Sequence, residues 1–169
     1  MSEVQAAARV QQQLEELSAA AIRALAHERD LHFRGRRLHR GRQRLPLFAP
    51  HLHPHPEHDD LASYRGAADG LALRLRISDA TLHARRSPAE PVRRMLFDLL
   101  EQLRVESLVD DALPGVQHNL AHRFECWSEG FMASRLHESA RGRLLFACAQ
   151  TLRARVFGTA VPEALDEMV

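Results

Sequence analysis

Apolar residues recur at steps of three and four along most of this chain, a spacing that places them on one face of an α-helix. The pattern predicts helices at roughly 4–29, 61–86, 90–109, 116–138 and 139–157. Residues 90–109 have the clearest pattern, and the stripe predicted to be buried there consists of Leu96, Leu99, Leu100, Leu103 and Leu108. Ser87-Pro88 is expected to end the preceding helix and Gly158 to end the last one.

The other predicted helices have apolar faces of their own. In residues 4–29 the face consists of Val10, Leu14, Leu17, Ala21 and Leu25. In residues 61–86 it consists of Leu71, Leu75, Ile77 and Leu82, with Asp59 or Asp60 as the expected N-cap. Gly66 and Gly70 should weaken the early part of that helix. Leu113-Pro114-Gly115 is expected to be a break, and a last helical segment is expected to start at Pro162.

Two stretches interrupt the helical pattern. In residues 31–48, Leu31, Phe33 and Leu38 are interleaved with Arg and His, and glycines punctuate the stretch, which predicts a short two-stranded β-hairpin. Pro46 would confine its strand to an edge because it has no N–H. Residues 49–60 contain three prolines and four histidines, so an exposed, irregular His- and Pro-rich loop is expected.

Composition favours a helical protein. The 169 residues are 45% hydrophobic but only 5% aromatic, so the core must be built mainly from Leu, Ala, Val and Ile. A chain of this length suits one domain with a sizeable core. We therefore expect a mainly α fold, with a single packed domain of five or six helices over residues 1–169 and one small β-hairpin near residues 31–48.

Charge and cysteine content argue against several classes of protein. The formal net charge is +1, from 23 basic and 22 acidic residues, which gives no overall attraction to nucleic acid or to a membrane surface. No apolar run reaches the roughly 18 residues of a membrane-spanning helix, and the first residues lack the pattern of a secretory signal. Cys126 and Cys148 lie too far apart for a CxxC motif. These features predict a cytoplasmic protein.

A series of motifs in residues 69–120 resembles a known family. The motifs, in order, are Asp69-Gly70-Leu71-Ala72-Leu73, Asp79, His83, Pro88, Leu96-Phe97-Asp98, Glu101-Gln102-Leu103-Arg104-Val105-Glu106, Gly115-Val116 and Asn119-Leu120. Their order is similar to that in the N-terminal region of the CobT subunit of the aerobic, ATP-dependent cobaltochelatase. The most specific part is an FDxxEQxRVE pattern that precedes GVxxNL.

The resemblance implies a role and a set of partners. CobT subunits act with an AAA+ ATPase, CobS, and with a large subunit, CobN, which holds the corrin ring. Their complex inserts cobalt into hydrogenobyrinic acid a,c-diamide during cobalamin biosynthesis. ATP and Mg²⁺ belong to the ATPase, so the resemblance implies no cofactor in this region and a non-catalytic role in assembly. Family members also carry an acidic linker and a von Willebrand A domain, which these residues lack. Whether the chain forms a homo-oligomer is left open.

Charged residues indicate two surfaces for partner contacts. Asp98, Glu101, Arg104 and Glu106 belong to the helix of residues 90–109, and the first three form a stripe opposite the leucines. A second surface is a basic stretch in the predicted hairpin that includes Arg36 and Arg37. It would suit an acidic partner or, as a less favoured alternative, nucleic acid. Ordinary solvated charges and ion pairs explain both patterns without a partner.

A metal site is the main alternative from another functional class. His118 and His122 have the HxxxH spacing that puts two imidazoles on one face of a helix, and Glu125 is a possible third ligand. His83 would complete the set from a neighbouring helix. These residues would suit Zn²⁺ in a zincin-like metal-dependent hydrolase or its inactive remnant, although a metallopeptidase would place Glu directly after the first histidine.

Two further histidine patterns have both a chemical and an ordinary interpretation. Asp79 lies one turn before His83 and could orient its imidazole for proton transfer or metal binding, but such a pair is more often a local hydrogen bond. The histidines of residues 49–60 could capture Co²⁺, Ni²⁺ or Zn²⁺ weakly. The prolines between them oppose one tight geometry, which favours an exposed loop.

Overall fold

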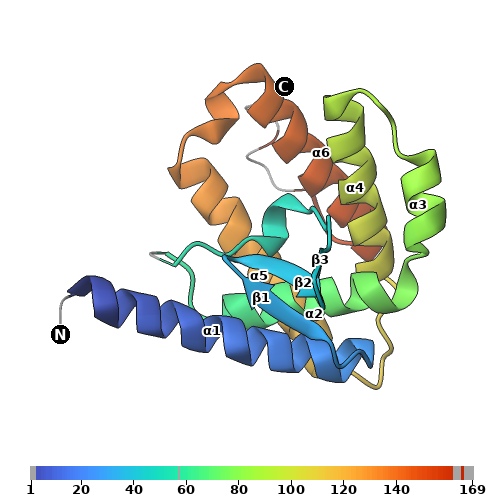
Figure 1. Ribbon diagram of the computed structural model, residues 1–169. Helices are drawn as coiled ribbons and strands as arrows, with labels where there is room; N and C mark the ends of the chain where they lie inside the picture. Colours follow the sequence, from blue (N-terminus) through green and yellow to red (C-terminus); the bar gives the residue numbers. More distant parts are fainter. Residues whose placement is uncertain (1–2, 57, 162–164, 166–169) are drawn as a thin grey trace.

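The computed structural model is mainly helical and describes residues 3–56, 58–161 and 165 (Figure 1). Its α-helices are α1 (Glu3–Ala26), α2 (Leu61–Ile77), α3 (Ala80–Arg86), α4 (Pro91–Glu106), α5 (Pro114–Ala133) and α6 (Ala140–Phe157). Two 3₁₀ helices, η1 (Pro50–Leu52) and η2 (Leu136–Glu138), and three short strands lie between them. The predicted fold class, mainly α with a small β element, is confirmed. Within the described residues, no helix is both long enough and apolar enough to cross a membrane.

The predicted helix of residues 61–86 is two helices, because the chain turns at Ser78. The Asp79 carboxylate accepts a hydrogen bond from the Leu82 N–H and so starts α3 as a new helix. Pro114, which was expected to lie in a break, instead begins α5, where its missing N–H costs nothing. Gly158 does end α6, with a left-handed φ of 65°. Apart from Leu165, the segment predicted after Pro162 lies outside the described residues.

The predicted hairpin is a three-stranded antiparallel sheet of β1 (Leu31–Arg34), β2 (Arg37–Arg40) and β3 (Gln43–Arg44), in that order. Gly35 and Arg36 form the turn between the first two strands, both with positive φ, as a tight hairpin turn requires. The apolar face of the sheet packs on α1 and α2. Pro46 follows the sheet, so its prediction as an edge-strand residue was wrong.

The hydrophobic core is arranged around α2, which packs against α1 and against α5 (Figure 1). One cluster joins α1, the sheet, η1 and α2 through Ala21, Ile22, Ala26, Leu31, Leu38, Ala49, Leu52, Ala68, Leu71 and Ala72. Another joins α4, α5 and α6 through Leu99, Leu103, Phe124, Trp127, Phe131, Phe146, Ala149 and Leu165. A smaller cluster of Leu73, Val105, Val116 and Leu120 connects α2, α4 and α5.

The buried face of α4 is narrower than the one that the leucine pattern predicts. Leu99 and Leu103 are 0% and 1% exposed, in agreement with the prediction. Leu100 and Leu108, however, are 46% and 54% exposed. Leu100 directly follows Leu99 along the helix and points about 100° away from it. Leu108 lies beyond the end of α4. The prediction was therefore wrong for these two residues.

Apolar residues of α1 and α3 were also assigned to the core in error. Val10 is exposed because the start of α1 extends beyond the rest of the molecule (Figure 1). Leu17 is exposed because it points to solvent from a part of the helix that has neighbours on its other side. The helix enters the core only from Ala19 onward. Leu82 is exposed because α3 is a separate short helix at the surface, none of whose residues is buried.

Gly66 and Gly70 allow other elements to approach α2 closely. A Cβ atom at Gly66 would lie 2.2 Å from the carbonyl oxygen of Asn119 in α5. A Cβ atom at Gly70 would lie 2.6 Å from Cδ2 of Leu52 in η1. The two glycines, which the sequence interpretation treated only as a weakness of the helix, are thus needed for the packing of α5 and η1.

Residues 49–60 are not an exposed loop throughout. Ala49, His51 and Leu52 are 1–3% exposed because η1 lies against α2 and α5. The second half of the segment is mostly exposed, as expected. The prediction was therefore wrong for the start of the segment, which carries His51 into the interior.

Candidate functional site

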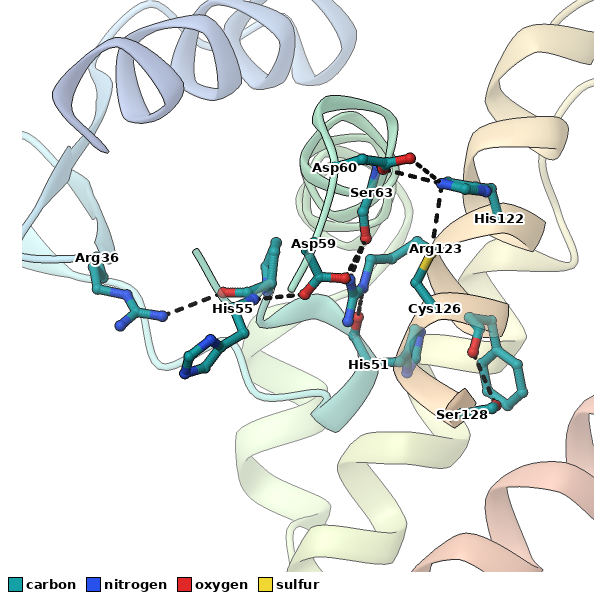
Figure 2. A network of polar contacts seen from close by, with 12 residues as sticks. Arg36, His51, His55, Asp59, Asp60, Ser63, His122, Arg123, Cys126 and Ser128 are labelled. Atoms are coloured by element: carbon teal, nitrogen blue, oxygen red, sulfur yellow. Dashed lines mark hydrogen bonds and ion pairs between the residues drawn. The ribbon is translucent and has the colours of Figure 1, made fainter. Parts of the chain in front are cut away.

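Arg123 of α5 connects this helix to η1 and to the start of α2 (Figure 2). The residue is 2% exposed. Its Nε donates to the carbonyl oxygen of His51, and its Nη1 donates to Asp59 Oδ1 and to Ser63 Oγ. Ser63 Oγ in turn donates to Asp59 Oδ1 over 2.9 Å. A buried guanidinium needs such partners, because an unpaired charge in the interior is strongly destabilising.

Asp59 balances the charge of Arg123. Burial alone would raise the pKa of Asp59, but the His55 backbone N–H and the nearby Arg123 charge together hold this pKa below its ordinary value. The His55 N–H donates to Asp59 Oδ2 over 2.6 Å. The ionised carboxylate therefore fixes the exposed end of the loop to α2 and α5.

A carboxylate, an imidazole and a thiol converge beside this network (Figure 2). Asp60 caps α2, since its Oδ1 accepts a hydrogen bond from the Ser63 N–H over 2.7 Å. His122 Nε2 lies 3.0 Å and 3.1 Å from the two carboxylate oxygens of Asp60 and 3.5 Å from Cys126 Sγ. The hydrogen bond from Ser63, followed by that from His122, lowers the pKa of Asp60. Cys126 and His122 lie one turn apart on α5.

The metal ligands predicted from the sequence are not brought together. Within the described residues, the three side chains whose potential ligand atoms all lie within 4.8 Å of one another are Asp60, His122 and Cys126. His118 and Glu125 are exposed on α5 and do not belong to this group. His83 lies on α3, in a different polar network.

His51 and Glu106 form a buried pair between η1 and α4. His51 Nε2 lies 2.8 Å from Glu106 Oε1, and the side chains are 1% and 0% exposed. Gln102 Nε2 donates both to the same carboxylate oxygen and to the carbonyl oxygen of Gly70 in α2. Burial alone would raise the pKa of Glu106, but the charge and hydrogen bond of His51, the hydrogen bond from Gln102 and the charge of Arg153 together lower this pKa. Glu106, a predicted partner contact, is thus an internal residue.

Asp98 of α4 belongs to a second network with α2 and α3. Asp98 Oδ1 lies 2.6 Å from His83 Nε2 and 3.8 Å from Arg74 Nη2. Arg74, which is 5% exposed, also donates to the carbonyl oxygen of Asp98. The His83 ring stacks on Phe97, with 4.5 Å between the ring centroids. The carboxylate beside His83 is therefore that of Asp98, while Asp79 caps α3.

Glu101 and Arg104 form an ion pair at the edge of α4. The Arg104 guanidinium donates to both Glu101 oxygens, over 2.7 Å and 2.8 Å, and Ser78 Oγ donates to Oε1. The hydrogen bond from Arg104 contributes most to lowering the pKa of Glu101 to about 2. Arg104 is about half exposed, so this pair is accessible from solvent.

Arg36 and Arg37, the other predicted contact residues, lie at the exposed turn between β1 and β2. The backbone N–H of Arg36 donates to Glu15 Oε1 over 3.1 Å. The side-chain Nη2 of Arg36 donates to the carbonyl oxygen of Pro54 over 3.2 Å. Both arginines line a cleft between α1, the sheet and α2. Tyr64 and Leu71 line the same cleft, so basic and apolar groups meet there.

Several residues of these networks were missed from the sequence. Arg123 lies between Leu120 and Phe124, whose side chains are buried on the same helix. A charged residue among apolar positions that are expected to be buried is a signal for a buried charge with internal partners. Arg74 next to Leu73 is a similar case. His51 had no such signal, because the residues around it predict an exposed loop.

Comparison with protein families identifies a relationship for nearly the whole chain. The family model described as "Cobalamin biosynthesis protein CobT" matches residues 9–169. The matched range includes every strand, every helix after α1 and most of α1 itself. No solved structure matches the chain significantly.

Proposed function

The chain belongs to the CobT family of cobalamin biosynthesis proteins, and on this basis we propose that it is a non-catalytic assembly region of the ATP-dependent cobaltochelatase. In this proposal it binds an AAA+ ATPase subunit of the CobS type and a large chelatase subunit of the CobN type. The complex inserts Co²⁺ into hydrogenobyrinic acid a,c-diamide. ATP and Mg²⁺ act at the ATPase subunit, and this region supplies contacts.

The distribution of polar residues on α4 is the observation that supports this role best. Asp98, Gln102 and Glu106 point into helix interfaces, where they contact α2, α3 and η1. Such contacts fix the relative positions of several elements, because each buried polar group must keep its partner. A region whose helices are fixed relative to one another can transmit a movement from one bound subunit to another.

Two exposed charged surfaces are suited to the proposed contacts. One is the basic turn of Arg36 and Arg37 with its adjoining cleft, which fits an acidic surface of a partner. The other is the edge of α4 that carries Glu101 and Arg104. Complementary charge at such surfaces governs the choice of partner and the rate of association more than the affinity.

A reconstituted insertion assay tests the proposal. The ATPase and large subunits would be mixed with ATP, Mg²⁺, Co²⁺ and the diamide, with and without this chain, and cobalt insertion would be followed by absorbance of the corrin. We expect cobalt insertion by the mixture to increase with the concentration of the chain, and the chain alone to insert no cobalt. An insertion rate that is the same at every concentration of the chain would contradict the proposal.

A further inference from the structure

We propose that Asp60, His122 and Cys126 form a binding site for one divalent transition-metal ion of the kind that zinc and cobalt represent. The site lies where the start of α2 meets α5 (Figure 2). It differs from the HxxxH set that the sequence indicated, and it does not rest on the proposed assembly function.

The spacing of the three side chains suits tetrahedral coordination. A nitrogen at about 2.0–2.1 Å and a thiolate at about 2.3 Å from a tetrahedral zinc ion lie about 3.6 Å from each other. His122 Nε2 and Cys126 Sγ lie 3.5 Å apart. A nitrogen and a carboxylate oxygen on the same ion would be separated by about 3.3 Å, and His122 Nε2 lies 3.0 Å and 3.1 Å from the oxygens of Asp60.

The supporting contacts hold the three groups in place. His122 and Cys126 are four residues apart on α5 and therefore project from the same face. Asp60 is fixed by the Ser63 N–H that caps α2. The relative position of α2 and α5 is fixed, because Arg123 of α5 donates a hydrogen bond to Ser63 of α2 in the interior. This hydrogen bond lies next to the close approach of the two helices at Gly66. Such contacts around the ligands are typical of metal sites with a defined geometry.

The ligand types also suit an ion of this class. Imidazole and thiolate favour zinc and its neighbours in the first transition series over Mg²⁺ or Ca²⁺. One carboxylate and one thiolate would neutralise the double charge of the ion. The Arg123 guanidinium nearby already has Asp59 as its counter-ion. Because the side chain of Asp60 is 58% exposed, solvent can supply the fourth ligand.

Metal binding at this site would displace a proton from the thiol. Burial is the main reason that the pKa of Cys126 is raised, so the metal-free side chain is a neutral thiol. Coordination converts the thiol and a metal ion into a metal thiolate and one proton, which leaves to solvent, without any change in oxidation state.

Titration with Co²⁺ tests the site, because cobalt bound to thiolate in a tetrahedral geometry has a charge-transfer band and intense visible absorption. The full chain would be purified without a histidine tag. We expect one equivalent of Co²⁺ to produce both features and Zn²⁺ to remove them. Cys126→Ser should abolish the charge-transfer band, and Asp60→Asn, which keeps a capping side chain, should weaken binding at least ~10-fold.

Two control variants distinguish this site from other sources of metal binding. Cys148→Ser removes the other cysteine, which lies on α6, and should leave the spectrum unchanged. Replacing His53, His55 and His58 by Ala should also leave it unchanged. The proposal is overturned if no charge-transfer band forms, if the band survives Cys126→Ser, or if either control removes it. Far-ultraviolet circular dichroism of each variant would establish that the helices are retained.

Discussion

His51 Nε2 and Glu106 Oε1 lie 2.8 Å apart in the interior, and this contact joins η1 to the end of α4. Removing one member leaves the other buried without its partner. We therefore expect Glu106→Ala to lower the free energy of unfolding by about 3–5 kcal/mol in denaturant melts. Glu129→Ala, at an exposed position of α5, should change this free energy by less than ~0.5 kcal/mol.

A double-mutant cycle isolates the contribution of this contact. His51→Ala and Glu106→Ala should be strongly non-additive, with a coupling energy of about 1–3 kcal/mol. Additive effects of the two substitutions would mean that the pair does not act as a unit in the folded protein.

The leucines of α4 provide a matched test of the buried face. Leu99→Ala and Leu103→Ala should each cost about 2–5 kcal/mol, because both side chains are fully buried. Leu100→Ala, one position further along the helix, should cost less than ~1 kcal/mol because that side chain is nearly half exposed. Equal losses at Leu99 and Leu100 in urea unfolding would show that the helix is rotated from the orientation described.

Two glycines in helices should respond to alanine with opposite signs. Gly66→Ala places a Cβ against the backbone of Asn119 and should destabilise the protein by about 1–3 kcal/mol. A Cβ at Gly130, within α5, meets no atom within 4 Å, so Gly130→Ala should stabilise by up to ~1 kcal/mol. Thermal unfolding of both variants measures this difference, and a stabilising Gly66→Ala would contradict the close approach of α2 to α5.

Glu101 should contribute to the dependence of stability on pH. Its pKa is lowered from 4.5 to about 2 in the folded protein, chiefly by Arg104. Its stabilising effect is thus complete above pH 4.5 and is lost as the pH falls toward about 2. Glu101→Gln should make the free energy of unfolding fall less steeply over this window. Identical slopes for wild type and Glu101→Gln would contradict the assignment.

The sequence predicted the helices better than it predicted which of their residues are buried. Periodicity located α4 to within three residues at each end, since Pro91 and the leucine spacing are local signals. It assigned Leu100 to the core because a helical face predicted from spacing is wider than the contact that neighbouring helices provide. The split at Ser78 was missed because the apolar pattern continues across it.

The contacts of the polar networks depend on the fold and could not be read from spacing. Asp59 and Arg123 are 64 residues apart, and His51 and Glu106 are 55 apart. Their pairing follows from the packing of η1 and α2 on α5, which local patterns do not encode. The HxxxH motif illustrates the same limit. Only His122 of that motif meets further candidate ligands within the described residues, and these come from Asp60 and Cys126.

The basic turn offers a direct test of the proposed partner surface. We expect the double variant Arg36→Glu, Arg37→Glu to bind the partner subunits at least ~10-fold more weakly, since two charges that would face an acidic surface are reversed. Arg141→Glu, Arg143→Glu makes the same change of charge at exposed positions of α6 and should bind normally. Surface plasmon resonance at two salt concentrations measures both. Equal affinities of the two double variants for the partner subunits would show that the basic turn is not part of the interface.

Association with the chelatase subunits is the central claim, and sedimentation velocity tests it most directly. This chain, labelled with a fluorophore, would be sedimented alone, with the AAA+ ATPase subunit in the presence of ATP, and with the large chelatase subunit. The account predicts that the labelled chain sediments with a partner as a faster species, and that excess unlabelled chain returns it to its own rate. Sedimentation of the labelled chain at the same slow rate in every mixture would contradict the account.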